Sequence, residues 1–229
     1  MSPSAPLSVI IPALDAAASL PATLAALAEG RALIRDIIVA DGGSRDTTSA
    51  ITEAAGATLV TMAKGRGGQL AAAAAAAAGE WLFFLHADTR PLPGWSVEVA
   101  RFIADPANRE RAGYFTYRLD DAARAARRLE RIVAWRSRVL GLPYGDQGLV
   151  LARTFYQALG GFPALPLMED VAFVRRIGRG RLVALATGAL TSADRYRRGG
   201  YLWRPLRNLG CLTLYLLGLP PRLILRLYG

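Results

Sequence analysis

The chain has 229 residues, enough for one large domain, and 52% of them are hydrophobic, which excludes an intrinsically disordered protein. Its single cysteine excludes an internal disulfide and a zinc site built from several cysteines. The formal net charge of +10 favours anionic ligands, although the richness in arginine and alanine also fits codon bias in a GC-rich genome.

The first 90 residues alternate short apolar runs with helical segments. The run LSVIIP at 7–12 predicts a buried strand, and a helix capped by Ser19 and ended by Gly30 follows it. Continuing in chain order, we expect strands at 36–41, 57–61 and 80–88, with helices at 44–56 and 69–79. This alternation is typical of an α/β fold, with a mainly parallel central sheet and helices on both faces.

The pattern is looser after residue 95. We expect a strand at 112–119, a basic helix at 121–140, a loop and strand within 145–152, a short helix within 154–162, and a helix that begins near Glu169 and Asp170. No linker-like stretch interrupts the chain, so we expect one domain at 1–205 and an amphipathic helical segment at 206–229. The leucines and arginines of this segment have three possible explanations: it packs on the domain, on a dimer partner or on a membrane surface.

Polar loops follow the strands, where ligands bind in parallel α/β sheets. In DGGSRDTT at 41–48, Asp41 can accept hydrogen bonds from a base or ribose, while Gly42 and Gly43 let the backbone approach a ligand. The segment KGRGGQL at 64–70 joins cations to a helix start, which suits a diphosphate, but it lacks the spacing of a P-loop. An ordinary glycine turn and a solvated basic loop are the respective alternatives.

The segment FLHADT contains the only histidine of the chain. His86 and Asp88 stand at i and i+2 near the end of the expected strand, so we expect them to face the same side. Asp88 suits a hard divalent cation, and His86 suits Mn²⁺ better than Mg²⁺. The alternative is a structural histidine beside an aspartate that caps a turn, and the motif alone favours it.

Three further polar segments lie in the second half of the chain. Glu169 and Asp170 can supply a general base, or they can simply interact with a helix dipole. The loop YGDQG at 144–148 is polar and flanked by glycines, with a similar ambiguity. The basic and aromatic stretch at 194–204 can bind phosphate or membrane, or it can be a solvated face.

The order of these motifs resembles the family 2 glycosyltransferases with the GT-A fold, over about residues 7–205. Within that family, GRGGQL, FLHADT, YGDQG, PLMEDV and TSADRY resemble the subgroup labelled arsenosugar-biosynthesis glycosyltransferases. The resemblance implies inverting transfer of one sugar from a nucleotide-diphosphate sugar, UDP favoured over GDP, with Mn²⁺ or Mg²⁺ as cofactor. The acceptor would be the hydroxyl of a small molecule or a lipid.

The resemblance also implies roles for individual residues. Asp170 would be the catalytic base with Glu169 beside it, and Asp88 with His86 would hold the metal. The nucleotide pocket would contain Pro12, Ala13, Asp15, Asp41, Gly42, Gly43, Arg66, Gln69 and Ala87, and the sugar or acceptor pocket Tyr144, Gly145, Asp146, Gln147, Arg195 and Arg197. One departure is Asp15-Ala16, which stands where the family usually has Asn-Glu.

Two other functions remain open. A nucleotidyltransferase that makes a nucleotide sugar would need a glycine-rich loop after the first strand, which PALDAAASL does not supply. A non-catalytic protein of the same fold would bind nucleotides or anions. The N-terminal residues show no signal peptide and the cysteine usage fits a reducing compartment, so we expect a cytoplasmic protein. Peripheral contact with the inner face of the membrane and a homodimer are further expectations, and no nucleic-acid partner is expected.

Overall fold

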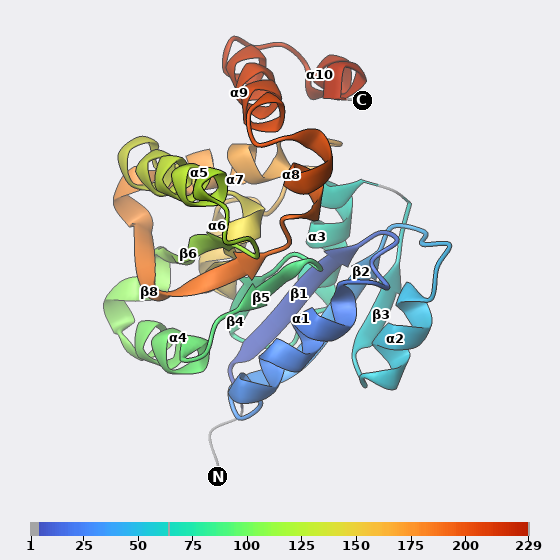
Figure 1. Ribbon diagram of the computed structural model, residues 1–229. Coiled ribbons are helices and arrows are strands. Elements are labelled where there is room, and N and C mark those ends of the chain that lie inside the picture. Colours follow the sequence, from blue (N-terminus) through green and yellow to red (C-terminus); the bar gives the residue numbers. More distant parts are fainter. Residues whose placement is uncertain (1–4, 64, 229) are drawn as a thin grey trace.

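The computed structural model describes residues 5–63 and 65–228 (Figure 1). Its strands are β1 (Leu7–Ala13), β2 (Ile34–Asp41), β3 (Thr58–Thr61), β4 (Trp81–Phe84), β5 (Thr89–Pro91), β6 (Ala112–Leu119), β7 (Leu149–Ala152) and β8 (Leu182–Thr191). Its α-helices are α1 (Leu20–Ala26), α2 (Thr48–Ala54), α3 (Arg66–Ala76), α4 (Trp95–Ala104), α5 (Arg124–Trp135), α6 (Arg153–Ala158), α7 (Glu169–Ile177), α8 (Asp194–Gly199), α9 (Trp203–Leu216) and α10 (Pro221–Tyr228).

Across the described residues, the strands form one mixed sheet in the order β3-β2-β1-β4-β7-β6-β8-β5. The strands β3, β2, β1 and β4 are parallel to their neighbours within this half. Strand β7 is antiparallel to β4 and β6, whereas β6 is parallel to β8, and β5 is antiparallel to β8. Helices lie on both sides of the sheet (Figure 1), so the predicted α/β fold with a mainly parallel central sheet is confirmed.

The parallel half of the sheet is buried on both faces. Val9, Ile10 and Ile11 of β1 have no exposed surface, although successive side chains of a strand point to opposite faces. Helix α3 packs on β1 and β2 through small side chains, including the buried Ala73 and Ala74. The alanine run therefore forms a helix that lies close to the sheet.

An aromatic cluster connects α7 to the end of β4. The ring of Phe162 lies 4.4 Å from that of Phe173 in α7 and 4.9 Å from that of Phe84 in β4, measured between centroids. Tyr156 of α6 contacts the same three rings. Because such pairs bury a large apolar area, this cluster fixes the first turn of α7 against the end of β4.

Several predicted boundaries are wrong for local reasons. Strand β4 ends at Phe84, four residues before the predicted end, because the chain turns at residues 87–88 into β5. The expected cap at Ser19 is absent, since its hydroxyl donates to Ala16 O at 3.4 Å. Helix α2 begins at Thr48 and not near Ser44, which instead hydrogen-bonds Asp41.

The structure also contains elements that the sequence did not predict, namely β5, α4, β8 and α8. The basic helix is α5, and a π-helical turn at Arg136–Leu140 continues it. Lys64, part of the predicted basic loop, lies outside the described residues. Nowhere in residues 5–63 or 65–228 is a helix both long enough and apolar enough to cross a bilayer.

Candidate active site

A pocket, here called the central pocket, opens beyond the end of β4 and beside the first turn of α7. Its walls also include the loop before β7, the segment after β8 and one side of α9. Of the predicted site residues it collects Arg66, His86, Asp88, Tyr144, Asp146, Glu169, Asp170 and Arg195. Residues that are up to about 130 positions apart therefore meet in one place, as ligand sites beyond strand ends require.

The turn that carries His86 and Asp88 is fixed on both sides. The hydroxyl of Thr23 in α1 donates to Ala87 O at 2.9 Å, and Ser192 N donates to Asp88 O at 3.1 Å. Both side chains line the central pocket, although neither residue belongs to β4. Burial, with the charges of Arg66 and Arg195, holds the pKa of His86 well below its usual value, so its imidazole is neutral at pH 7.

The carboxylate of Asp88 faces a cation across the pocket. Asp88 Oδ2 lies 3.7 Å from Arg195 Nη2, and the Asp88 side chain is only 21% exposed. Arg195 comes from α8, the first helix after β8, so a strand that the sequence did not predict brings this charge to the site.

The first turn of α7 presents two carboxylates that differ in burial. Glu169 is buried, and its Oε1 lies 3.5 Å from Nη1 of Arg66 at the start of α3. Burial, together with the charge of Asp170, raises the pKa of Glu169 to about 7 against the opposing effect of Arg66. Asp170 is half-buried, and its oxygens accept backbone hydrogen bonds from Val171 and Gly145.

The loop before β7 brings Gly145 and Asp146 into contact with these groups. A Cβ at Gly145 would stand 2.4 Å from His86 Nε2, so no side chain fits there without displacing the imidazole. Asp146 Oδ1 is buried with no hydrogen-bond partner in the described structure. Burial, reinforced by the nearby carboxylates of Asp170 and Asp88, raises the pKa of Asp146 to about 6, although Arg136 opposes the shift.

The two other predicted residues of this loop have different surroundings. The ring of Tyr144 lines the pocket, and the guanidinium of Arg136 stacks 3.5 Å from its centroid. Gln147 is buried beneath the pocket, where it donates to Phe115 O at 3.1 Å and accepts from the Ser137 hydroxyl at 2.9 Å. Gln147 therefore supports the loop from below.

The predicted nucleotide residues lie along the carboxyl ends of β1 and β2. Pro12 lines a smaller pocket that adjoins the central one and shares Arg66 and His86 with it. The buried amide of Gln69 donates to Ala13 O at 3.0 Å and to Ala40 O at 2.8 Å, which ties the two strand ends together. A Cβ at Gly42 would lie 2.9 Å from that amide nitrogen, so Gly42 is also part of this junction.

The carboxylates of Asp41 and Asp15 are engaged by their own loops. Asp41 is buried and accepts hydrogen bonds from the backbone of Gly43 and Ser44 and from the Ser44 hydroxyl. Asp15, at a positive φ of 49°, accepts from Arg45 N at 2.8 Å. These contacts fix the shape of the loops after β1 and β2.

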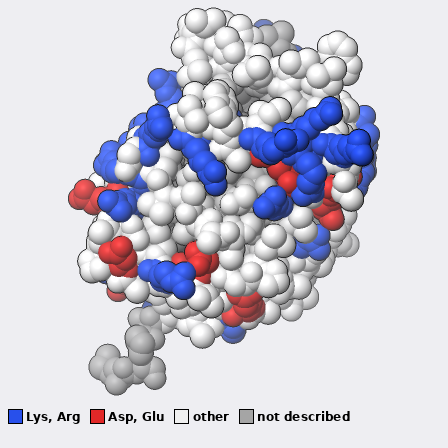
Figure 2. All heavy atoms as spheres, turned by 60° about the vertical axis from the view of Figure 1, so that its left-hand side comes forward, with Lys and Arg blue, Asp and Glu red and all other residues white. Residues whose placement is uncertain are grey.

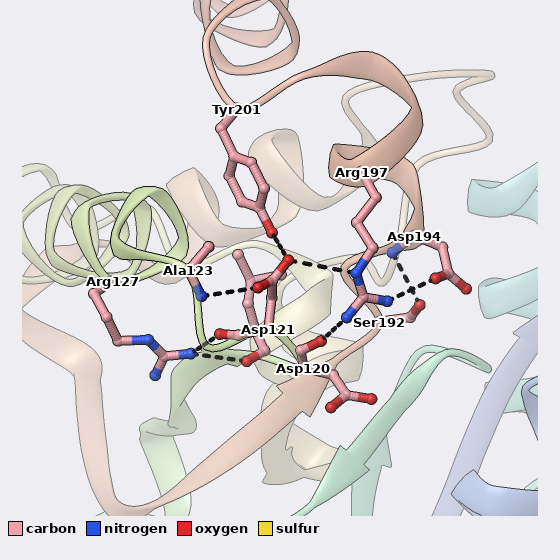
Figure 3. Close-up of polar contacts among 9 residues, drawn as sticks. Asp120, Asp121, Ala123, Arg127, Ser192, Asp194, Arg197 and Tyr201 are labelled. Carbon is pink, nitrogen blue, oxygen red and sulfur yellow. Dashed lines mark hydrogen bonds and ion pairs between the residues drawn. The ribbon is translucent and has the colours of Figure 1, made fainter.

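Arg195 and Arg197 both belong to α8, but only Arg195 lines the pocket. Figure 3 shows Arg197 among a separate set of polar groups. Its guanidinium contacts Asp121 at 3.4 Å and Asp194 at 3.0 Å, and it donates to Asp120 O. The structure therefore does not bring Arg197 into the sugar or acceptor pocket; it holds α8 against the end of β6.

The sequence did not identify individually several residues of the central pocket, namely Tyr117, Thr191, Ser192, Tyr196, Arg204 and Asn208, although Tyr196 and Arg204 lie in the basic and aromatic stretch at 194–204. They come from β6, the end of β8, α8 and α9, all in the part of the chain with the weaker pattern. The apolar run LVALATGALT was the available signal, because a strand there would have aimed its last residues at the same sheet edge.

Comparison with known proteins gives results at two levels. The family model described as glycosyl transferase family 2 matches residues 8–141. A search of curated protein sequences found no match. Many solved structures are similar to this chain, but those described below are 16–21% identical to it, so they bear on the fold alone.

One similar structure is TarS of S. aureus, with a TM-score of 0.65 and 16% identity, covering 91% of this chain and 39% of that chain. TarS 1–349 in complex with UDP-GlcNAc has a TM-score of 0.63 and 16% identity, covering 82% of this chain and 58% of that one. This chain thus spans less than two thirds of either.

Another is glucosyl-3-phosphoglycerate synthase from Mycobacterium tuberculosis, in complex with Mn²⁺, UDP and glucosyl-3-phosphoglycerate. Its TM-score is 0.57 at 21% identity, and the match covers 82% of this chain and 70% of that chain. These structures show that the fold is GT-A. Since the family model matches more than half of its residues, the chain belongs to glycosyl transferase family 2.

Proposed function

We propose that the protein is an inverting glycosyltransferase that moves one sugar from a nucleotide-diphosphate sugar to an acceptor hydroxyl. The observation that carries this proposal is that Asp170 lies in one pocket with Asp88, Arg66 and Arg195. A base and a set of charges suited to a diphosphate thus face the same space. The complexes of similar structures with UDP-GlcNAc and with UDP favour a UDP-sugar as donor.

Arg66 and Arg195 are the proposed diphosphate ligands. Each is already near a carboxylate, with Arg66 3.5 Å from Glu169 and Arg195 3.7 Å from Asp88. Both guanidinium groups line the central pocket, so a diphosphate that enters it can contact both of them.

The pocket offers ligands to a divalent cation that a bound diphosphate would help to hold, since the described residues contain no group of three or more His, Cys, Asp or Glu side chains placed to bind one alone. Its oxygen donors include the Asp88 carboxylate and the buried Oδ1 of Asp146, which lacks a hydrogen-bond partner in the described residues. Carboxylate oxygens suit Mg²⁺ and Mn²⁺, and the neutral His86 adds a nitrogen that suits Mn²⁺. A bound cation would neutralise charge on the leaving diphosphate, with Asp88 as principal ligand and His86 as the second.

Asp170 is the proposed general base. As the acceptor oxygen bonds to the anomeric carbon, the bond from that carbon to the diphosphate breaks and the acceptor proton passes to Asp170. The backbone N–H groups of Val171 and Gly145 hold this carboxylate in place, at 2.7 and 3.3 Å. Glu169 lies behind it and positions Arg66.

The remaining sequence-based expectations are proposals as well. The chain is placed in the arsenosugar-biosynthesis-type subgroup on the motifs GRGGQL, FLHADT, YGDQG, PLMEDV and TSADRY alone. Its transferase domain is assigned to residues 1–205, and the helical segment from 206 onwards is treated as an appendage. A cytoplasmic location is proposed on the cysteine usage.

The variant Asp170→Asn tests this function. We expect UDP release from UDP-glucose or UDP-GlcNAc, with glycerol as a probe acceptor, to fall roughly 10²–10⁴-fold because the proton acceptor is lost. The Kd for UDP with Mn²⁺, measured by calorimetry, should change little.

Asp120→Asn is the matched control, because Asp120 is 58% exposed and pairs with Arg90 at the surface. It should keep wild-type rates. Undiminished turnover by Asp170→Asn would remove the role given to Asp170, and an inactive wild-type protein that also fails to bind UDP would contradict the whole assignment.

A further inference from the structure

The outer side of helix α9 is apolar. Leu206, Leu209 and Leu216 are each about half exposed, at 49%, 57% and 48%, and their spacing places them along one stripe of the helix. A surface helix normally places such a stripe against the core. Here the buried side of α9 is instead formed by Cys211 and Leu212.

The stripe extends beyond the ends of its helix. Trp203, at the start of α9, is 74% exposed, and Leu217, just after its end, is 79% exposed. Leu202 adds to it at the start of the helix. We call these six residues (Leu202, Trp203, Leu206, Leu209, Leu216 and Leu217) the α9 outer face.

The α9 outer face lies at one end of the molecule. Figure 1 shows α9 and α10 projecting above the body, and Figure 2 shows this end as largely uncharged, with basic side chains below it. The junction before α9 is held in place, because the Tyr201 hydroxyl donates to Asp121 Oδ2 at 2.7 Å (Figure 3). The apolar stripe therefore projects from a fixed base.

The charged residues of the chain from Arg195 onwards have a single sign. The sequence contains no Asp or Glu after Asp194, whereas arginines follow at 195, 197, 198, 204, 207, 222 and 226. Arg207 is exposed within α9, and Arg222 and Arg226 are exposed on α10. A second copy on this face would bring like charges together, whereas an anionic surface complements them.

We propose that the α9 outer face docks on an anionic membrane surface. Leucines, an exposed tryptophan and flanking arginines are the side chains that a helix lying in a bilayer interface presents, with the apolar groups in the acyl region and the arginines at the headgroups. The chain's net charge of +10 adds long-range attraction to the same lipids.

The docked helix would also border the central pocket. Its inner side contributes Arg204 and Asn208 to the pocket lining. One helix diameter, about 10 Å, would then separate the pocket wall from the lipid headgroups. The docking itself does not depend on the proposed transferase activity, so the two can be tested separately.

The test uses the full chain and vesicles of two compositions. Cosedimentation should show binding to phosphatidylcholine vesicles that contain 30% phosphatidylglycerol, and little binding to pure phosphatidylcholine. Bound protein should be released as the salt concentration rises, because surface charge is screened.

Tryptophan fluorescence gives a second readout. Trp81 and Trp95 are buried and should not respond, so a Trp135→Phe background leaves Trp203 as the exposed reporter among the four tryptophans. Its emission should shift to the blue only with the anionic vesicles.

Matched single variants locate the surface. Leu209→Gln should lower vesicle binding about tenfold, whereas Val97→Gln, at a similarly exposed position on α4, should not change it. Both should keep the wild-type melting temperature and UDP affinity, which separates lost docking from lost folding or lost donor binding.

Three outcomes would overturn the proposal. The first is unchanged binding in Leu209→Gln, and the second is equal binding to both vesicle types. The third is a wild-type dimer that becomes monomeric in Leu209→Gln and binds no vesicles, which would assign the face to a second copy.

Discussion

At the scale of single residues, Asp146 is a carboxyl group whose buried surroundings disfavour its charged form. One carboxylate oxygen is buried without a hydrogen-bond partner in the described structure, and burial raises its pKa to about 6 from an ordinary value of 3.8. The folded state therefore favours the protonated form of Asp146. The contribution of this protonated group to the free energy of unfolding is fully present below pH 3.8 and is lost as the pH rises through 6.

We expect Asp146→Asn to remove this pH dependence. Relative to wild type, the free energy of unfolding of the variant should rise by on the order of 2 kcal/mol between pH 4 and pH 8. Urea denaturation at a series of pH values measures it. Asp120→Asn, which replaces an exposed carboxylate, is the control for the loss of a surface charge. If the difference in the free energy of unfolding between Asp146→Asn and wild type did not change with pH, burial would not disfavour the Asp146 carboxylate.

Residue roles were the least predictable part of the site. The sequence and its family resemblance predicted Asp41, Gln69 and Arg197 as polar groups beside a ligand. It could not show that Asp41 hydrogen-bonds its own loop, that Gln69 ties β1 to β2, or that Arg197 turns to Asp121. Each outcome depends on a partner that only the tertiary structure supplies.

At the scale of elements, helix α3 illustrates how closely the site's walls are packed. A Cβ at Gly67 would stand 2.1 Å from Pro163 O and 2.9 Å from Leu165 N, both backbone atoms that precede α7. In the described structure, no atom beyond the adjoining residues and the backbone of its own helix lies within 4 Å of the Cβ position of the neighbouring Gly68. Close packing therefore excludes a side chain at Gly67, whereas there is room for one at Gly68.

We expect Gly67→Ala to destabilise the protein by about 1–3 kcal/mol, because the loop before α7 must shift. Gly68→Ala should be neutral or stabilising by up to about 1 kcal/mol, because alanine favours the helix and meets no obstacle. The free energy of unfolding in urea compares the pair. If Gly67→Ala were as stable as Gly68→Ala, the close approach of α3 to residues 163–165 would be incorrect.

The elements also show what the sequence can predict. The strands β1 to β4 are short apolar runs that alternate with helical segments, so their pattern predicted both their existence and the parallel sheet, although Leu7 of β1 pairs with Trp81 of β4, far along the chain. Strand β8 contains Gly188 and several alanines, and it pairs with β6 and β5, which lie far away in sequence. Local sequence does not encode such a pairing, and β8 was missed although its apolar run was a signal for a strand.

At the scale of the whole molecule, ligand binding and folding are linked, because a ligand that binds only the native state stabilises it. UDP at about 100 times its Kd should raise the free energy of unfolding by about 2.7 kcal/mol. If Asp88 holds a cation beside the diphosphate, Mn²⁺ should enlarge the increase in melting temperature given by UDP.

Thermal unfolding with UDP, Mn²⁺ and both together measures this. Asp88→Asn should abolish the extra increase from Mn²⁺ while keeping part of the increase from UDP alone. Asp194→Asn, which changes an exposed carboxylate on α8, should keep both. An undiminished Mn²⁺ effect in Asp88→Asn would assign the cation to other ligands.

The pairing of β5 with β8 has a consequence for how the protein assembles. The turn at His86–Asp88 leads into Thr89, whose hydroxyl lies 3.0 Å from that of Thr191, 102 residues later. During synthesis the parallel half can therefore collapse while this turn still lacks its partner strand. Since contacts of such long separation form late, the site would be the last part of the domain to become ordered, after most of its core is already buried.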